Sequence, residues 1–153
     1  MIQPSTYLIV PGLLIRGELD MIDRLIRTAT FESGSTTATT AARAVKHNLQ
    51  MPMEGSVEKR QMDEIVLQAL AHSPLIQTAM TPVKILPPII SKYEPGMQYG
   101  YHVDSPIMAH SQTGPIRADV AMTLFLTEPG EYEGGELALV TPGQEQRYKL
   151  AKG

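Results

Sequence analysis

The sequence predicts an α+β protein, because two helical patterns lie in its first half and short β-prone segments follow in its second half. Helices followed by regularly spaced strands are typical of an α+β fold whose strands form an antiparallel sandwich or barrel. We expect one domain across the 153 residues, with helical support over about 1–82 and the strands over about 83–153.

The helices are predicted from apolar residues that recur every three or four positions. This spacing predicts a helix over about 17–29, and a second over 58–72 that should end at Ser73-Pro74. Residues 31–44 are small and polar and are expected to form a loop. Strands are expected at 5–10, 45–51, 89–93, 99–103, 120–127, 136–140 and 146–150, between turn signals rich in proline and glycine.

The composition limits what the chain can do. A net charge of −3 and a pI of about 5.8 argue against a nucleic-acid or membrane-surface partner, because phosphate binding needs a basic face. Cysteine is absent, which excludes disulfides, thiolate metal sites and cysteine nucleophiles, so that any metal must be held by His, Asp or Glu. The first 20 residues lack a basic start and are interrupted by proline and glycine, so we expect a cytoplasmic protein.

The candidate metal ligands are His102 and Asp104, within KYEPGMQYGYHVDSP at 92–106. On a strand, residues two apart point to the same face, so an imidazole and a carboxylate would project side by side. These are two of the three ligands of a facial triad of two histidines and one carboxylate, which leaves positions open on Fe(II).

The bland alternative is that His102 and Asp104 are exposed polar residues on a strand, since H-x-D occurs often by chance. Three features favour the metal site: the preceding Tyr/Gly-rich turn, the β-rich segment that follows, and the paired Gly134-Gly135 before an apolar strand. His110 is a possible further ligand but fits an exposed loop better.

Three segments together resemble a known family. The pattern KY-x-x-G-x-x-YG-x-HVD, then R-x-D-x-x-x-TLFL, then EYEGGEL, resembles the prolyl-4-hydroxylase-like superfamily and, within it, the bacterial PKHD-type hydroxylases. The VKHN run at 45–48 extends the resemblance upstream, so that it covers the chain from about residue 7 to its end.

This resemblance implies a double-stranded β-helix, or jelly roll, with helices packed on one sheet. It also implies Fe(II) as cofactor, 2-oxoglutarate as co-substrate and ascorbate to keep the iron reduced. The implied reaction oxidises a C–H bond of a small-molecule or peptidyl substrate while 2-oxoglutarate loses carbon dioxide and becomes succinate. His102 and Asp104 fall on the family's first two metal ligands, and Tyr93 falls where relatives place a tyrosine near 2-oxoglutarate. Packing explains Tyr93 equally well, and Asn48 is a weaker candidate for a substrate contact.

The sequence departs from the family pattern at its end. The second histidine ligand and the arginine that binds 2-oxoglutarate follow K-L-x-x-G in the family, and here KLAKG occupies 149–153. We therefore interpret the chain as truncated, with the C-terminal strands of the jelly roll missing. We expect little hydroxylase activity from these 153 residues, and self-association through exposed strands as a homo-oligomer. The alternatives are an inactive relative acting as a binding or structural protein, and a metal-binding cupin without 2-oxoglutarate.

Overall fold

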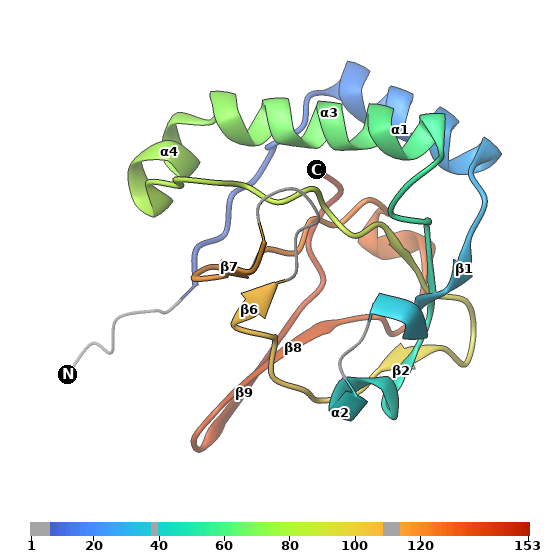
Figure 1. Cartoon of the computed structure of the whole chain (residues 1–153), viewed down its shortest axis with the longest axis vertical. Coiled ribbons are helices and arrows are strands. Elements are labelled where there is room, and N and C mark those ends of the chain that lie inside the picture. The colour runs from blue at the N-terminus through green and yellow to red at the C-terminus, as the bar shows by residue number, and fades with distance from the viewer. Residues whose placement is uncertain (1–6, 38–39, 109–113) are drawn as a thin grey trace.

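The structure is a computed structural model that describes residues 7–37, 40–108 and 114–153. Its long helices are α1 (Arg16–Thr28) and α3 (Val57–His72), which confirm the two predicted helices within one residue at each end. The two helices lie side by side along the top of Figure 1. A short helix, α2 (Thr40–Arg43), and a 3₁₀ turn, η1 (Gly34–Thr37), lie in the segment that was predicted to be a loop.

Local hydrogen bonds fix where the helices begin. The Glu18 carboxylate accepts a hydrogen bond of 2.8 Å from the backbone N–H of Ile15 at the start of α1. The Ser56 hydroxyl accepts one of 3.2 Å from the N–H of Lys59 at the start of α3. Ser73 ends α3 as predicted, but its hydroxyl also accepts from Ile76 N–H and begins another helix, α4 (Pro74–Met80). Proline suits the first position of a helix, so Pro74 continues the helical layer where the sequence predicted a stop.

The core lies between the helices and the segments below them. α1 contributes Ile22 and Leu25, α3 contributes Met62, Val66 and Leu70, and the remaining buried members are Leu14, Met51, Ile76 and Ile90. Met51 and Ile90 flank short strands, and the N–H of Met51 donates to the carbonyl of Ile90. The core thus joins the helical layer to the segments next to β3 and β4, at Met51 and Ile90.

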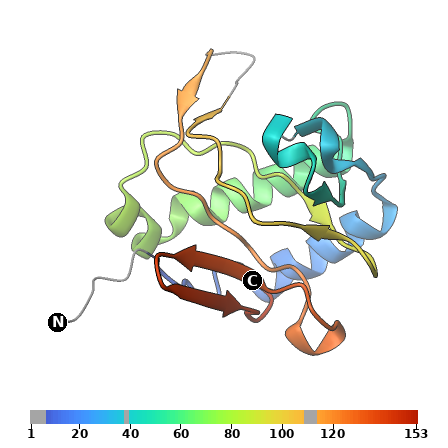
Figure 2. The same cartoon turned by 90° about the horizontal axis from the view of Figure 1, so that it is seen from below.

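The strands form four small antiparallel sheets within the described residues. β3 (Leu49–Gln50) lies between β1 (Glu32–Ser33) and β4 (Ser91–Lys92), while β2 (Lys46–His47) pairs with β5 (Gln98–Tyr99). β6 (Ile107–Met108) pairs with β7 (Ile116–Arg117), and β8 (Leu137–Thr141) pairs with β9 (Gln144–Tyr148). Figure 2 shows these last two pairs as separate ribbons. A second 3₁₀ turn, η2 (Pro129–Glu131), precedes β8.

The α+β class is therefore confirmed, but the sheets do not close into a barrel in the part of the chain described here. Residues 120–127 were predicted to be a strand and instead run without a strand partner. Within this segment the Phe125 carbonyl accepts from the N–H of Gly153, and Leu124 and Leu126 pack against the core. The predicted strand at 5–10 is also absent over residues 7–10, whereas the strands at 136–140 and 146–150 are confirmed with small shifts.

The C-terminal residues return to the helical layer. The Lys152 ammonium binds both carboxylate oxygens of Asp23 on α1, at 2.5 and 2.6 Å, and the Gly153 carbonyl accepts from the N–H of Leu14. No helix among the described residues has both the length and the apolar character needed to cross a bilayer.

Candidate metal centre

The predicted ligands His102 and Asp104 lie close together. The imidazole Nε2 and the carboxylate Oδ1 are 3.3 Å apart, although neither residue belongs to a strand as the sequence predicted. β5 ends at Tyr99, and the chain continues as an irregular segment. Their proximity therefore comes from the conformation of this segment rather than from strand alternation.

The orientation of the imidazole is set by two contacts. Its Nδ1 lies 2.7 Å from the carbonyl oxygen of Gly100, which can only accept, so Nδ1 carries a proton and donates it. The ring also stacks on Tyr99, with centroids 3.7 Å apart and an angle of 11° between the planes. Metal-binding histidines are commonly oriented by such a hydrogen bond from their other ring nitrogen.

This tautomer has a direct electrostatic consequence. With the proton on Nδ1, the lone pair of Nε2 faces an oxygen of the Asp104 carboxylate at 3.3 Å. A metal ion bound to both atoms would offset the repulsion between these two acceptors. Ligand atoms in neighbouring positions around a metal, with bonds of about 2.1 Å, lie about 3 Å apart, so the pair fits two such positions.

A third protein ligand does not accompany the pair within the described part of the chain, where no three His, Asp or Glu side chains form a group suited to a metal. His110 lies outside the described residues. His47 is exposed on β2, and the Nδ1 of His72 lies 2.8 Å from the carbonyl of Gln68 at the end of α3. Arg117 pairs with Asp119 at 2.7 Å.

The two weaker candidates, Tyr93 and Asn48, lie next to each other. Burial raises the pKa of the Tyr93 phenol, and the nearby Asn48 amide partly opposes this increase by lowering the same pKa. Asn48 itself is 3% exposed, and neither its amide nitrogen nor its amide oxygen makes a hydrogen bond of regular geometry with the described residues. A buried amide without partners is costly, so it marks a position that packing alone does not explain.

Two further buried polar residues of this region, Lys46 and Gln50, were not predicted from the sequence as site residues. They alternate with Asn48 on the buried side of β2 and β3, at 9%, 3% and 3% exposure. The signal was present as K-x-N-x-Q at 46–50, because a strand that places polar residues on its buried face departs from the usual pattern. The exposed residue between the first two, His47, confirms the alternation.

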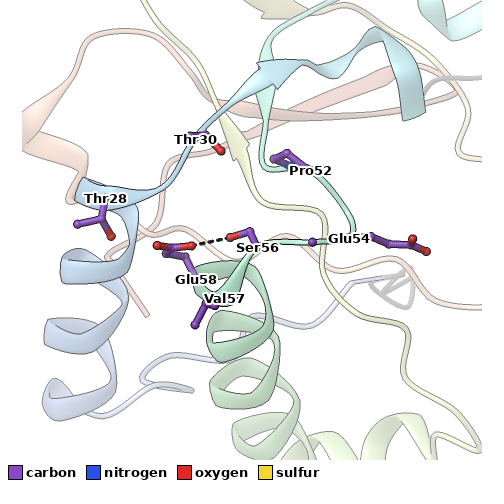
Figure 3. Close-up of a pocket in the computed structure, with 8 residues that line it drawn as sticks. Thr28, Thr30, Pro52, Glu54, Ser56, Val57 and Glu58 are labelled. Atoms are coloured by element: carbon purple, nitrogen blue, oxygen red, sulfur yellow. Dashed lines mark hydrogen bonds between the residues drawn. The ribbon is translucent and has the colours of Figure 1, made fainter.

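A separate pocket of about 440 Å³ opens at the start of α3. Figure 3 shows Thr28 and Thr30 on one side and Ser56, Val57 and Glu58 on the other. The Ser56 hydroxyl donates to Glu58 at 2.7 Å, and this bond is the largest cause of the lowered pKa of that carboxyl. None of the predicted site residues lines the pocket, so we assign it no part in the candidate site.

Comparison with known proteins supports the resemblance seen in the motifs. The chain is 38% identical over 145 residues to a PKHD-type hydroxylase of Gluconacetobacter diazotrophicus, covering 94% of the chain and 63% of that protein. It is 42% identical to a PKHD-type hydroxylase of a Synechococcus strain and 41% identical to one of Thioalkalivibrio sulfidiphilus, covering 95% of the chain and 64% of each relative. No family model matches the chain.

The alignments cover a larger share of the chain than of its relatives. The chain spans somewhat less than two thirds of the length of these curated relatives, while nearly all of the chain is matched. The resemblance predicted from KY-x-x-G-x-x-YG-x-HVD is confirmed by these alignments, which cover nearly all of the chain. Over nearly its whole length, the chain is related to the PKHD-type hydroxylases.

Proposed function

We propose that the chain contributes the iron site of a hydroxylase that uses Fe(II) and 2-oxoglutarate. The observation that carries the proposal is the His102–Asp104 pair, whose two acceptor atoms lie 3.3 Å apart, a separation that suits two neighbouring ligands of one metal ion. The relatives named PKHD-type hydroxylase support an oxygenase of this kind. The relatives are longer than the chain, so the activity of a whole protein is part of the proposal rather than a property of these residues.

In this proposal His102 and Asp104 occupy two neighbouring positions on the iron. The bound iron would supply the oxygen chemistry, namely the activation of dioxygen for insertion into a C–H bond. The Gly100 carbonyl holds the imidazole in the tautomer that presents Nε2, and Tyr99 fixes the plane of the ring. A third ligand must come from outside the described residues or from water.

The co-substrate and reductant follow from the same resemblance. We propose 2-oxoglutarate, with its loss of carbon dioxide and conversion to succinate, and ascorbate as the reductant. Tyr93 is the proposed contact to 2-oxoglutarate because its phenol is neutral, partly exposed and close to the metal-binding segment in sequence. Asn48, adjacent to it, is the proposed substrate contact. The substrate class, a small molecule or a peptidyl group, stays open.

A second candidate is a binding or structural protein without catalysis. It is favoured by one observation, the lack of a third His, Asp or Glu beside the pair among the described residues. Two ligands hold Fe(II) weakly, so succinate formation separates the two candidates. We propose measuring it with Fe(II), ascorbate and 2-oxoglutarate, on this chain and on a version extended to the length of the relatives.

The expected result is little turnover by the chain and clear turnover by the extended protein, lost in Asp104→Ala. Robust turnover by the chain itself would contradict the expected need for further ligands. No turnover by the extended protein, despite normal folding and metal binding, would favour the candidate without catalysis.

The remaining parts of the proposal concern architecture, assembly and location. We propose that the described strands are part of a jelly roll in a single domain, and that the protein is cytoplasmic. We also propose a homo-oligomer, because large apolar side chains such as Val103 (91% exposed), Val120 and Val140 face solvent. Light scattering at micromolar concentration tests for the homo-oligomer, and a monomer at all concentrations would contradict it.

A further inference from the structure

Lys46 occupies an unusual place on the buried face of β2. Its side chain is 9% exposed, and its ammonium donates to the Thr37 hydroxyl at 2.8 Å. The same hydroxyl lies 2.5 Å from the amide oxygen of Gln50, whose amide nitrogen donates to Ser91 at 3.2 Å. The Lys46 ammonium is therefore the charged end of a hydrogen-bonded series of neutral side chains, which links η1 to β3 and β4.

No carboxylate pairs with Lys46 among the described residues. Three other lysines in the described part of the chain do form ion pairs, which join Lys59 to Asp63, Lys92 to Glu94 and Lys152 to Asp23. Burial lowers the pKa of Lys46, as expected for an ammonium that has lost water and gained no counter-charge. A buried cation without an anion is unfavourable unless a bound anion completes it.

This ammonium is adjacent to the candidate metal centre. Lys46 and Tyr99 are register partners in the β2–β5 pair, and the ammonium lies 5.0 Å from the centre of the Tyr99 ring. The same ring stacks on His102. One aromatic side chain therefore contacts both the unpaired cation and the imidazole that is proposed to bind iron.

Asn48 supplies a second unmatched polar group on the same face. Its amide makes no hydrogen bond of regular geometry among the described residues, although it lies close enough to the Tyr93 phenol to lower the pKa of that group, and it packs against Gly34, where an added Cβ would lie 2.0 Å from the amide oxygen. An ammonium without a carboxylate partner and an amide without a well-formed hydrogen bond, two residues apart on the same face, are more than packing requires. The combination indicates a site for a polar ligand.

We propose that Lys46 binds a carboxylate of the organic substrate, so that the hydroxylase acts on a carboxylic acid. This proposal rests on the proposed function, since it places the ligand beside the iron pair. A single ammonium with one hydroxyl neighbour matches the single charge of a carboxylate. A phosphate dianion would call for more than one cation. The ammonium donates to the hydroxyl of Thr37, an exposed residue, so it lies close to the surface.

The test uses acetate as probe and acetamide as its neutral counterpart of the same shape, added to ¹⁵N-labelled, metal-free protein. Binding is followed at the backbone amides of Thr37 and Lys46. Acetate should shift these signals in a saturable way and acetamide should not. Lys46→Met should weaken acetate binding roughly tenfold, as expected for loss of one charge-assisted hydrogen bond. Lys92→Met, at an exposed lysine that also contacts an aromatic ring, should change nothing.

Equal shifts with acetate and acetamide, or unchanged acetate binding in Lys46→Met, would overturn the proposal. Tighter binding of inorganic phosphate than of acetate would also overturn it. A further measurement separates substrate from co-substrate: the affinity of Mn²⁺-loaded protein for 2-oxoglutarate should be the same in Lys46→Met. A tenfold loss there would assign Lys46 to the co-substrate instead.

Mn²⁺ binding by the same samples separates this proposal from the proposed function. Binding of Mn²⁺ without any acetate effect would contradict only the role of Lys46. An acetate effect that depends on Lys46 in protein that does not bind Mn²⁺ at His102 and Asp104 would contradict the iron site instead.

Discussion

Lys59 and Lys46 are both buried, yet their surroundings differ. The ammonium of Lys59, on α3, binds both carboxylate oxygens of Asp63 at 2.6 Å, one turn along the same helix. The ammonium of Lys46, on β2, has a hydroxyl and an aromatic ring as neighbours. The charge of Lys59 is neutralised by a carboxylate of its own helix. The charge of Lys46 lies beside the Tyr99 ring, which stacks on His102 of the candidate metal centre.

The same contrast extends to the two regions. The helical layer buries apolar side chains such as Ile22 and Met62, at 0% exposure, and matches its one buried charge. The face formed by residues 46–50 buries three polar side chains, and one of them, Asn48, makes no hydrogen bond of regular geometry among the described residues. Native proteins tolerate such mismatches mainly where function requires them, so the comparison assigns stability to the helices and ligand binding to the strands.

The largest effect is expected from Asp63→Ala in the helical layer. The change leaves the Lys59 ammonium buried without a counter-charge and should lower the free energy of unfolding by about 3 kcal/mol. Urea denaturation measures the loss. Asp20→Ala, at an exposed position of α1, is the control and should cost less than about 0.5 kcal/mol. Equal losses in the two variants would contradict the structural role of the pair.

The next effect is expected from Gly34→Ala at η1. The new Cβ would lie 2.0 Å from the amide oxygen of Asn48, so the two groups must separate, at a cost of about 2 kcal/mol. Combining it with Asn48→Ala removes the clash and should recover most of that loss, which a double-mutant cycle in urea measures. Additive losses would mean that Asn48 does not pack on Gly34.

A smaller effect is expected from Lys46→Met. Because this ammonium has no carboxylate partner among the described residues, its removal should change the free energy of unfolding by less than about 1 kcal/mol in either direction. The test compares urea denaturation of Lys46→Met with that of Asp63→Ala. A loss of unfolding free energy as large as that of Asp63→Ala would show that Lys46 stabilises the fold. It would contradict the proposed difference between the helical layer and the face formed by residues 46–50.

The smallest effect is a difference in pH dependence. The pKa of Lys46 is lowered on folding, so between that value and its ordinary value of 10.5 the unfolded chain binds more protons than the folded one. This group therefore makes the protein more stable as pH rises through that window. Several tyrosines with raised pKa values act in the opposite direction, so the relevant quantity is the difference from Lys46→Met. As pH rises towards 10.5, the wild type should gain stability relative to the variant, and a parallel pH dependence would contradict a lowered pKa.

The helices could be predicted from the sequence because their apolar spacing is local, as the agreement at α1 and α3 shows. The strands could not be predicted as well, because pairing depends on partners far along the chain. Residues 120–127 have a strand-like composition and yet lack a strand partner among the described residues. α4 was missed because Ser73-Pro74 serves both as the end of one helix and as the beginning of the next.

The candidate site was predicted in part. His102 and Asp104 are adjacent as expected, although an irregular segment rather than a strand brings them together. Lys46 was missed because a lysine on a strand is usually exposed, and only the structure shows it buried. The lone pair of Nε2 that faces Asp104 could not be inferred from the sequence, since it depends on the hydrogen bond to Gly100.

The most direct test of the account is Mn²⁺ binding, measured by electron paramagnetic resonance on the wild type and on His102→Ala and Asp104→Ala. His47→Ala and Asp119→Ala are matched controls at exposed positions of the same residue types. The account predicts that each ligand variant binds Mn²⁺ at least about tenfold more weakly than the wild type, while both controls bind as the wild type does. Equal binding by all five proteins would show that His102 and Asp104 do not hold the metal and would contradict the proposed metal centre.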